Sequence, residues 1–193
     1  MTRPQGWAAV VLTGGTAARM DGIDKAALEL DGASLLDRAL AATADAGEVV
    51  VVGEPVPTPR PVTWTREQPA GGGPAAGVLA GIDALREPPE LVAVLAVDMP
   101  RVTAQTFGRL TAALEDDADG ALLVDDGGRR QLLCGVYRLS ALQQARPRAR
   151  EDDHGLPVRR LLEPLHLVEV AALADEARDV DTWEDLRELR EPR

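Results

Sequence analysis

The 193-residue sequence has no asparagine, one lysine, one cysteine, two histidines and two serines. The single cysteine, Cys134, excludes an internal disulfide, and this predicts a cytoplasmic protein. With His154 and His166 as the only histidines, the chain cannot form a zinc site with the usual spacing of Cys and His ligands. Neither Ser34 nor Ser140 lies in a G-x-S-x-G element, so serine hydrolysis is not expected.

Positive charge and aromatic side chains are also scarce. The net charge is −11 and aromatic residues make up 3% of the chain. Nucleic acid and anionic membranes both need a basic surface, so neither is expected as a partner. The first apolar run, Trp7–Leu12, is too short for a signal peptide or a membrane span. The length and the 45% hydrophobic content predict one globular domain, residues 1–193.

Short apolar runs alternate with segments of helical apolar spacing, which predicts an α/β fold with a mostly parallel sheet. The continuously apolar "LVAVLAV" is typical of a central strand covered on both faces. The predicted strands are Trp7–Leu12, Val49–Val52, Thr63–Thr65 and Leu91–Val97, and the predicted helices are Leu35–Ala44, Ala75–Leu85 and Thr103–Leu114.

The second half is less regular and predicts an antiparallel part of the sheet. The turn-forming "DDGGRR" separates Ala121–Val124 from Gln131–Arg138, so these two segments are expected to pair as a hairpin. Leu167–Val170 is a further candidate strand. In "TWED", Thr182 as N-cap and Asp185 reaching back would start a last helix.

Candidate functional residues follow the predicted strands. "TGGTAARMDGIDK" follows the first strand, Gly53 the second, "REQPAGGGPAAG" the third and "DMP" the fourth. In an open parallel sheet, ligands bind beyond the carboxyl ends of the strands, and these segments all meet at that edge. We therefore expect one site there.

The first of these segments suits an anionic ligand. Gly14 and Gly15 allow backbone N–H groups to approach a phosphate, while Arg19 and Lys25 add positive charge. Arginine fills the other 20 basic positions, so a lysine here indicates a role for a compact ammonium group. The segment does not match the P-loop pattern, and a solvated surface lysine is the alternative.

Two other segments have competing interpretations. "GGGPAA", residues 71–76, matches a loose dinucleotide fingerprint, but it also suits a loop with Pro74 in the first turn of a helix, or a loop that closes over a base or sugar. The arginines within residues 145–150 and 158–160 form either a solvated face or a contact for a second phosphorylated substrate.

Aspartates supply candidate metal ligands. Asp98 directly follows a predicted buried strand and is well placed to hold Mg²⁺, although an aspartate there could also cap the next helix. Asp179 and Asp181 would share one face of an extended segment, where they could add an oxygen ligand or shield a helix start.

Taken in order, these segments resemble the MobA-like nucleotidyltransferases, the molybdenum cofactor guanylyltransferases. "LTGGTAARMDGIDKAALELDGASLL" resembles the family's pyrophosphorylase-type signature, and "GGGPAAGVLAGIDAL", "VLAVDMP", "LLCGVYRLSAL" and "DVDTWEDL" resemble its later elements. The resemblance spans nearly the whole chain. It implies a Rossmann-like three-layer α/β/α fold of the nucleotide-diphospho-sugar transferase type.

The resemblance also implies a reaction, the Mg²⁺-dependent transfer of GMP from GTP to molybdopterin with release of pyrophosphate. A molybdoenzyme or a cofactor-insertion protein would be the further partner. By position, Arg19, Lys25 and Asp98 would be catalytic, and Asp98 with Asp181 would hold the metal. The implied nucleotide-binding residues are Leu12, Thr13, Gly14, Gly15, Lys25, Gly53, Glu67 and Asp98.

Several departures from the family pattern leave alternatives open. Asp21 replaces a glycine in the first segment, and Asp179 and Asp181 replace two asparagines in a chain that has none. The sister cytidylyltransferases often carry that D-x-D-T form, whereas the small residues Thr13 to Gly15 favour a purine. Cytidylyl transfer to molybdopterin, guanylyl transfer to another small phosphorylated acceptor, and a non-catalytic molybdopterin-binding adaptor are the alternatives.

Overall fold

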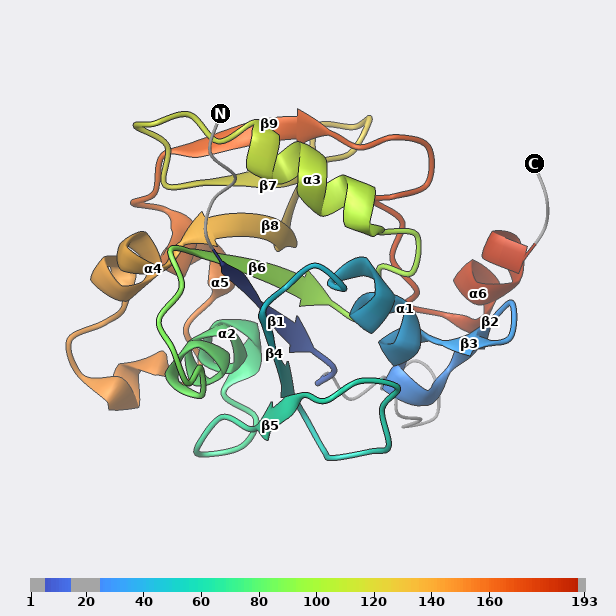
Figure 1. Cartoon of the computed structure of the whole chain (residues 1–193), viewed down its shortest axis with the longest axis horizontal. Helices are drawn as coiled ribbons and strands as arrows, with labels where there is room; N and C mark the ends of the chain where they lie inside the picture. Colours follow the sequence, from blue (N-terminus) through green and yellow to red (C-terminus); the bar gives the residue numbers. More distant parts are fainter. Residues whose placement is uncertain (1–5, 15–24, 191–193) are drawn as a thin grey trace.

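The computed structural model describes residues 6–14 and 25–190. Seven strands form one sheet in the order β5-β4-β1-β6-β8-β7-β9, with β5 and β9 at its two edges (Figure 1). The strands are β1 (Trp7–Leu12), β4 (Glu48–Val52), β5 (Thr63–Thr65), β6 (Leu91–Ala96), β7 (Gly120–Val124), β8 (Arg130–Arg138) and β9 (Leu167–Ala171).

The strand directions confirm a mostly parallel sheet with an antiparallel part. β1 pairs in parallel with β4 and β6, and β4 with β5. β8 runs antiparallel to both β6 and β7, while β9 is parallel to β7. The predicted hairpin around "DDGGRR" is therefore present. Because β8 is reversed, its first residues lie at the same edge as the carboxyl ends of β1 and β6.

Helices cover both faces of the sheet and give three layers. α1 (Leu35–Ala42), α3 (Ala104–Ala112) and α6 (Trp183–Arg190) pack on one face, against side chains such as Val11 and Leu95. α2 (Gly73–Asp83), α4 (Leu139–Ala145) and α5 (Val158–Leu162) cover the other. The remaining elements are η1 (Lys25–Ala27), η2 (Arg150–Asp153) and the small β2 (Glu29–Leu30) and β3 (Ala33–Ser34) hairpin.

The main differences from the sequence prediction are at helix ends. α2 begins at Gly73, two residues before the predicted start, with Pro74 in its first turn as expected. Thr103, and not Asp98, is the N-cap of α3, where its N–H donates to Thr106 Oγ1 at 3.0 Å. The side chain of Asp98 is therefore left for other contacts.

Two glycines of α2 set its distance from the sheet. A Cβ on Gly81 would lie 2.4 Å from a methyl carbon of Val10, and one on Gly77 would lie 3.2 Å from a methyl carbon of Leu12. Larger residues at these positions would push the helix off β1. The close packing fixes the start of α2 relative to the carboxyl end of β1.

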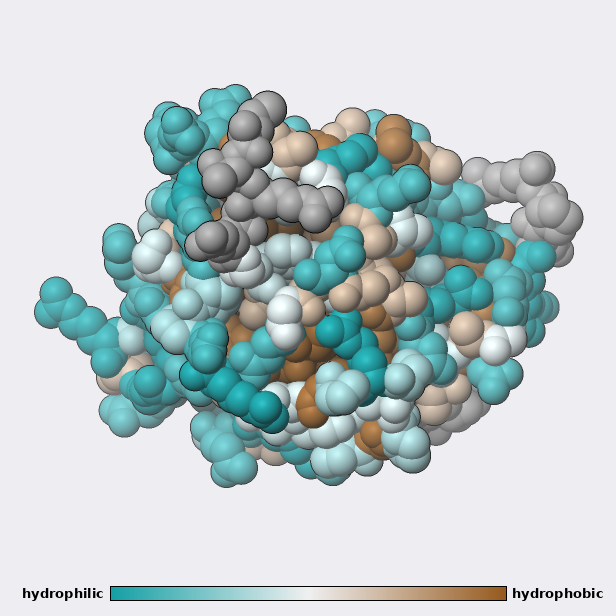
Figure 2. All heavy atoms as spheres, in the orientation of Figure 1, coloured by the Kyte–Doolittle hydropathy of each residue, from teal (hydrophilic) through white to brown (hydrophobic). Residues whose placement is uncertain are grey.

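The surface seen in Figure 2 is mainly hydrophilic, with hydrophobic residues gathered near the middle of this face. Among the described residues, the large hydrophobic side chains that are exposed are Val56, Leu173 and Trp183. None of the helices in the described part of the chain is long and apolar enough to cross a membrane.

A buried ion pair anchors the segment between β9 and α6. Glu176 is 8% exposed, and its carboxylate accepts hydrogen bonds from Thr106 Oγ1 (2.7 Å), from Arg109 Nη2 (2.6 Å) and from the N–H of Leu173 (2.7 Å). Burial alone would raise the pKa of Glu176, but these hydrogen bonds outweigh it and lower the pKa. The contact ties the segment that leads to Asp179 and Asp181 to α3.

We expect Glu176→Gln to lower the free energy of unfolding at pH 7 by about 1.5–3 kcal/mol, the range for a hydrogen bond to a charged group. Since the folded-state pKa of Glu176 is lowered, its contribution is present above about pH 4.3, the ordinary glutamate pKa, and is lost as the pH falls through the folded-state pKa. Urea unfolding of both proteins at pH 7 and pH 3 measures this.

The control is Glu163→Gln, which removes an exposed carboxylate paired with Arg160 and should change stability by less than about 1 kcal/mol. A Glu176→Gln effect that is equally large at pH 7 and pH 3 would contradict the assignment to the ionised carboxylate.

Candidate active site

Lys25 lies between two carboxylates at the carboxyl edge of the sheet. Its Nζ is 3.2 Å from Asp98 Oδ2 and 2.7 Å from Asp181 Oδ1. Lys25 begins η1, Asp98 follows β6, and Asp181 precedes α6, so three distant parts of the chain meet here. The structure therefore brings together three of the residues that the sequence singles out, and Lys25, with 11% of its side chain exposed, is not a solvated surface lysine.

The environment favours charge on Lys25 and disfavours it on Asp98. Burial tends to lower the pKa of Lys25, but the hydrogen bonds and negative charges of Asp181 and Asp98 outweigh it and raise the pKa above its ordinary value. Burial raises the pKa of Asp98, with smaller effects in the same direction from Asp181 and Asp179 and an opposing one from Lys25. The Lys25 ammonium thus offsets the repulsion among these carboxylates.

Hydrogen bonds fix the position of Asp181. The N–H of Val180 donates to the carbonyl oxygen of Asp98 at 2.8 Å, which joins this segment to the end of β6. Asp185 Oδ2 accepts from the N–H of Asp181 (3.0 Å) and of Thr182 (2.7 Å), and the N–H of Asp185 donates back to Thr182 Oγ1 (3.1 Å). The capping box is confirmed, and the side chain that shields the helix start is Asp185, while Asp181 faces Lys25.

Thr13 and Gly53 connect the ends of β1 and β4. Both the N–H and the Oγ1 of Thr13 donate to the carbonyl oxygen of Val52, at 3.1 and 3.0 Å. A Cβ on Gly53 would lie 1.9 Å from that Oγ1. Gly53 has no positive φ, so the glycine is required by this packing. Contacts of Thr13 and Gly53 with a nucleotide stay predictions.

Three other predicted nucleotide contacts differ in their surroundings. Leu12 is 6% exposed, its side chain packs in the core on the α2 side, and its carbonyl oxygen accepts from Val97 N–H at 3.0 Å. Gly14 is exposed, and a Cβ on it would meet open space. Gly15 and Arg19, together with Asp21, lie outside the described residues.

Glu67 lies beside the start of α2. Its Oε1 accepts from the N–H of Gly71 at 3.1 Å, and Gly72 lies close to both Glu67 and His154. The N–H of Gly155 donates to the carbonyl oxygen of Gly72 at 2.8 Å. The 71–73 glycines are therefore held from two sides, in a loop several residues beyond β5 and not in the tight strand-to-helix turn of a dinucleotide fold.

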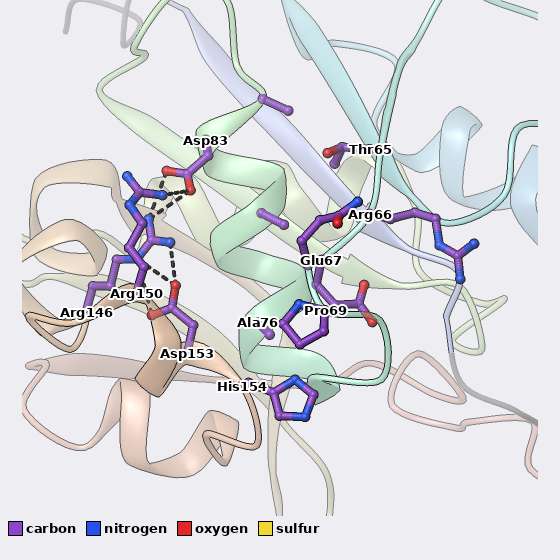
Figure 3. A pocket seen from close by; sticks show the side chains of 13 residues that line it. Thr65, Arg66, Glu67, Pro69, Ala76, Asp83, Arg146, Arg150, Asp153 and His154 are labelled. Atoms are coloured by element: carbon purple, nitrogen blue, oxygen red, sulfur yellow. Dashed lines mark hydrogen bonds and ion pairs between the residues drawn. The ribbon is translucent and has the colours of Figure 1, made fainter.

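The same region contains a cavity of about 370 Å³ between residues 65–69, α2 and η2 (Figure 3). On one side, Arg146 and Arg150 point toward Asp83 and Asp153, and Arg146 Nη1 lies 2.9 Å from Asp83 Oδ1. These acidic partners balance the two arginines. None of the arginines of the predicted basic segment lines the groove next to Asp98.

A second cavity, of about 380 Å³, adjoins Asp98 on the β8 side. We call it the β8 groove; it is lined by the carboxylate residues Asp98, Asp179 and Asp181 and by Arg129, Arg130 and Gln131 at the start of β8. No sequence motif marks the last three residues for function. A polar residue at the head of the apolar run "QLLCGVY" was the available signal, but only the reversed direction of β8 brings it to this edge.

Comparison with known protein sequences identifies relatives of one family. The family model described as the MobA-like NTP transferase domain matches residues 9–171. A protein of Opitutus terrae named as a probable molybdenum cofactor guanylyltransferase is 35% identical over 154 residues, 77% of this chain and 75% of that protein. A molybdenum cofactor guanylyltransferase of Burkholderia lata is 35% identical over 130 residues, 61% of each chain.

Solved structures agree in fold. The molybdopterin-guanine dinucleotide biosynthesis protein A of Archaeoglobus fulgidus superposes with a TM-score of 0.71 at 20% identity, over 95% of this chain and 96% of that one. A nucleotidyl transferase from Methanothermobacter gives a TM-score of 0.73 at 19% identity, over 96% of both chains. At these identities the likeness supports the three-layer fold alone.

The contact between Thr13 and Gly53 can be tested by a double-mutant cycle, which compares the free energies of unfolding of the wild type, Gly53→Ala, Thr13→Ala and the double variant. Gly53→Ala should destabilise the protein because the added Cβ displaces Thr13 Oγ1 from its hydrogen bond with Val52. Thr13→Ala should cost about 1 kcal/mol for that hydrogen bond. In the double variant the added methyl group has room, so its cost should fall short of the sum by about 0.5–3 kcal/mol, the coupling of residues in contact. Urea unfolding measures all four, and additive costs would show that Gly53 is not there to accommodate Thr13.

Proposed function

The chain belongs to the MobA-like NTP transferase family, and from this premise we propose that it transfers GMP from GTP to molybdopterin and releases pyrophosphate. The observation that carries the proposal is the meeting of Lys25, Asp98 and Asp181 at the edge where the predicted nucleotide segment ends. The curated relatives are named for guanylyl transfer to the molybdenum cofactor, which favours GTP and a molybdopterin acceptor.

In this reaction an oxygen of the acceptor's phosphate monoester attacks the α-phosphorus of GTP. A new P–O bond forms, the bond between the α-phosphorus and the α–β bridging oxygen breaks, and pyrophosphate leaves with that electron pair. The attacking oxygen is already anionic, so no strong general base is needed. The enzyme's task is to hold two anions together and to stabilise the charge that develops on the leaving group.

Lys25 suits this task. An ammonium group has three donors, and the two carboxylates account for two of them. The pKa of Lys25 is raised, so the group stays cationic at neutral pH and can donate to an oxygen of the triphosphate. In a chain of net charge −11 this local cation offsets the repulsion that the nucleotide would otherwise meet.

Asp98 and Asp181 also fit a magnesium ion. One oxygen of each already lies within bonding distance of a single cation, the Lys25 ammonium. Within residues 6–14 and 25–190 no group of three or more His, Cys, Asp or Glu side chains could hold a metal by itself. Two carboxylates suit Mg²⁺, which usually completes its shell with phosphate oxygens and water. When bound here, Mg²⁺ would supply Lewis-acid polarisation of the phosphoryl oxygens.

We also propose where the enzyme acts and which proteins receive its product. We place it in the cytoplasm, as one nucleotidyltransferase domain of residues 1–193 whose product passes to a molybdoenzyme or a cofactor-insertion protein. Membership of this family supports a role in cofactor biosynthesis, before the step at which an enzyme receives the finished cofactor.

The direct test is pyrophosphate release from GTP, CTP, ATP and UTP, each with Mg²⁺ and with or without molybdopterin. We expect release only when GTP and molybdopterin are both present, because the phosphate of the acceptor is the nucleophile. Preference for CTP would support the cytidylyltransferase alternative. No release with any nucleotide would support the adaptor and contradict the proposal.

A substitution of Lys25 tests whether its ammonium group acts on the triphosphate. Lys25→Ala should lower guanylyl transfer by about 10²-fold or more, the scale of one lost charge-stabilising donor. Arg86→Ala removes an exposed cation of equal charge, beside Glu48 at the opposite edge of the sheet, and should keep the wild-type rate. Near wild-type turnover in Lys25→Ala would show that this ammonium does not act on the triphosphate.

A further inference from the structure

The charge cluster, by which we mean Lys25, Asp98 and Asp181, is assembled from three segments of the chain. Asp98 follows β6, Asp181 precedes α6, and Lys25 opens η1, which leads into the β2–β3 hairpin. The contacts that join the hairpin, α6 and the end of β6 therefore decide whether the Lys25 ammonium reaches both carboxylates.

The hairpin is coupled to Lys25 by hydrogen bonds of the backbone. The N–H of Leu28 donates to the carbonyl oxygen of Lys25 at 3.1 Å, and the carbonyl oxygen of Leu28 accepts from the N–H of Leu35 at 2.8 Å. Leu30, in β2, is fully buried in the same core as Leu189 of α6. A shift of the hairpin would therefore carry the backbone of Lys25 with it.

Arginines from two helices hold the hairpin in place. Arg38 of α1 donates through Nε to the carbonyl oxygen of Leu30 at 3.0 Å. Arg190 of α6 donates through Nη2 to the carbonyl oxygen of Glu29 at 2.7 Å, and α6 lies beside β2 (Figure 1). These hydrogen bonds from charged groups attach the hairpin to both α1 and α6.

Arg101 connects the hairpin to the two carboxylate segments. It follows Asp98 closely in the chain, and its Nη2 donates to the carbonyl oxygen of Leu189, in the helix that begins just after Asp181. Its Nη1 lies 3.7 Å from Oδ2 of Asp31, in the hairpin turn. Because a guanidinium presents its donors in a fixed planar fork, this one side chain can hold both partners at a set separation.

From these contacts we propose that Arg101 is a positioning residue for Lys25. It fixes the hairpin and α6 relative to the end of β6, and through them it sets the distance from the ammonium to the two carboxylates. The printed partners of Arg101 are Asp31 and Leu189, so it acts on the charge cluster only through these segments. This inference rests on the proposed nucleotidyl transfer, since a displaced ammonium would slow that reaction.

The reactivity of the single lysine tests this position without any substrate. Lys25 bonds both carboxylates and has 11% of its side chain exposed, so acetic anhydride should acetylate it more slowly than Nα-acetyl-lysine in the same solution. We expect Arg101→Ala to raise the rate at Lys25 several-fold, measured by mass spectrometry of its peptide. Asp31→Asn keeps a residue type that tolerates the positive φ of 53° and should raise the rate by a smaller factor.

Arg60→Ala is the matched control. Arg60 is also half-buried and also donates to carbonyl oxygens at the end of a helix, those of Thr43 and Ala46, but these lie beside the start of β1 at the opposite edge of the sheet. Both arginine variants should lose stability in urea, while only Arg101→Ala should change the reactivity of Lys25. A folded Arg101→Ala protein that is labelled at the wild-type rate, or an equal rise in both variants, would overturn the proposal.

Activity then shows whether this positioning serves the reaction. Since a misplacement of about 1 Å can cost about 10²-fold in rate, Arg101→Ala should lower kcat for guanylyl transfer by about 10-fold. In a Lys25→Ala background the same change should alter the residual rate by less than about 2-fold, because no ammonium is left to position.

An unchanged kcat in Arg101→Ala, or an equal fall in both backgrounds, would overturn a role of Arg101 that acts through Lys25. A wild type that transfers no GMP would contradict the proposed function, and the labelling of Lys25 would still decide whether Arg101 holds it in place.

Discussion

The contact of the Lys25 ammonium with Asp98 and Asp181 is the interaction on which the site depends. Three carboxylates, those of Asp98, Asp179 and Asp181, line one groove in a chain of net charge −11. Without a cation among them, their mutual repulsion would oppose folding of this edge and the approach of any phosphate. The ammonium balances that charge in the protein alone, and it leaves a donor for an anionic ligand. A lysine, with a compact charge on a flexible stem, suits both demands better than the planar fork of an arginine.

The rest of the fold holds the members of this contact in place. Parallel pairing of β1 with β4 and β6 brings their carboxyl ends to one edge. The Val180–Asp98 backbone hydrogen bond and the capping box at Thr182 set the Asp181 segment, and Glu176 ties the preceding residues to α3. The reversed strand β8 then adds a second wall, so the charge cluster lies between the ends of β1 and β4 on one side and the β8 groove on the other. That arrangement suits a reaction in which two anionic substrates must meet.

Much of the scaffold could be predicted because it rests on local patterns. Apolar runs gave β1 and β5 with their observed ends, and the spacing of Thr182 and Asp185 gave the last helix start. The meeting of Lys25 with Asp98 was also predictable, since both follow parallel strands. The contacts of Glu176 were not, because they depend on which distant element packs beside it. For Gly53, sequence alone suggested a ligand contact, whereas its neighbour in the structure is Thr13.

Because the chain has a single lysine, the central contact can be observed directly by NMR of protein labelled with ¹⁵N at the lysine side chain. We expect one protected ammonium signal at neutral pH, which moves in Asp98→Asn and Asp181→Asn and again when GTP and Mg²⁺ are added to the wild type. A signal with the shift and rapid exchange of a free lysine, insensitive to both substitutions and to the nucleotide, would contradict it.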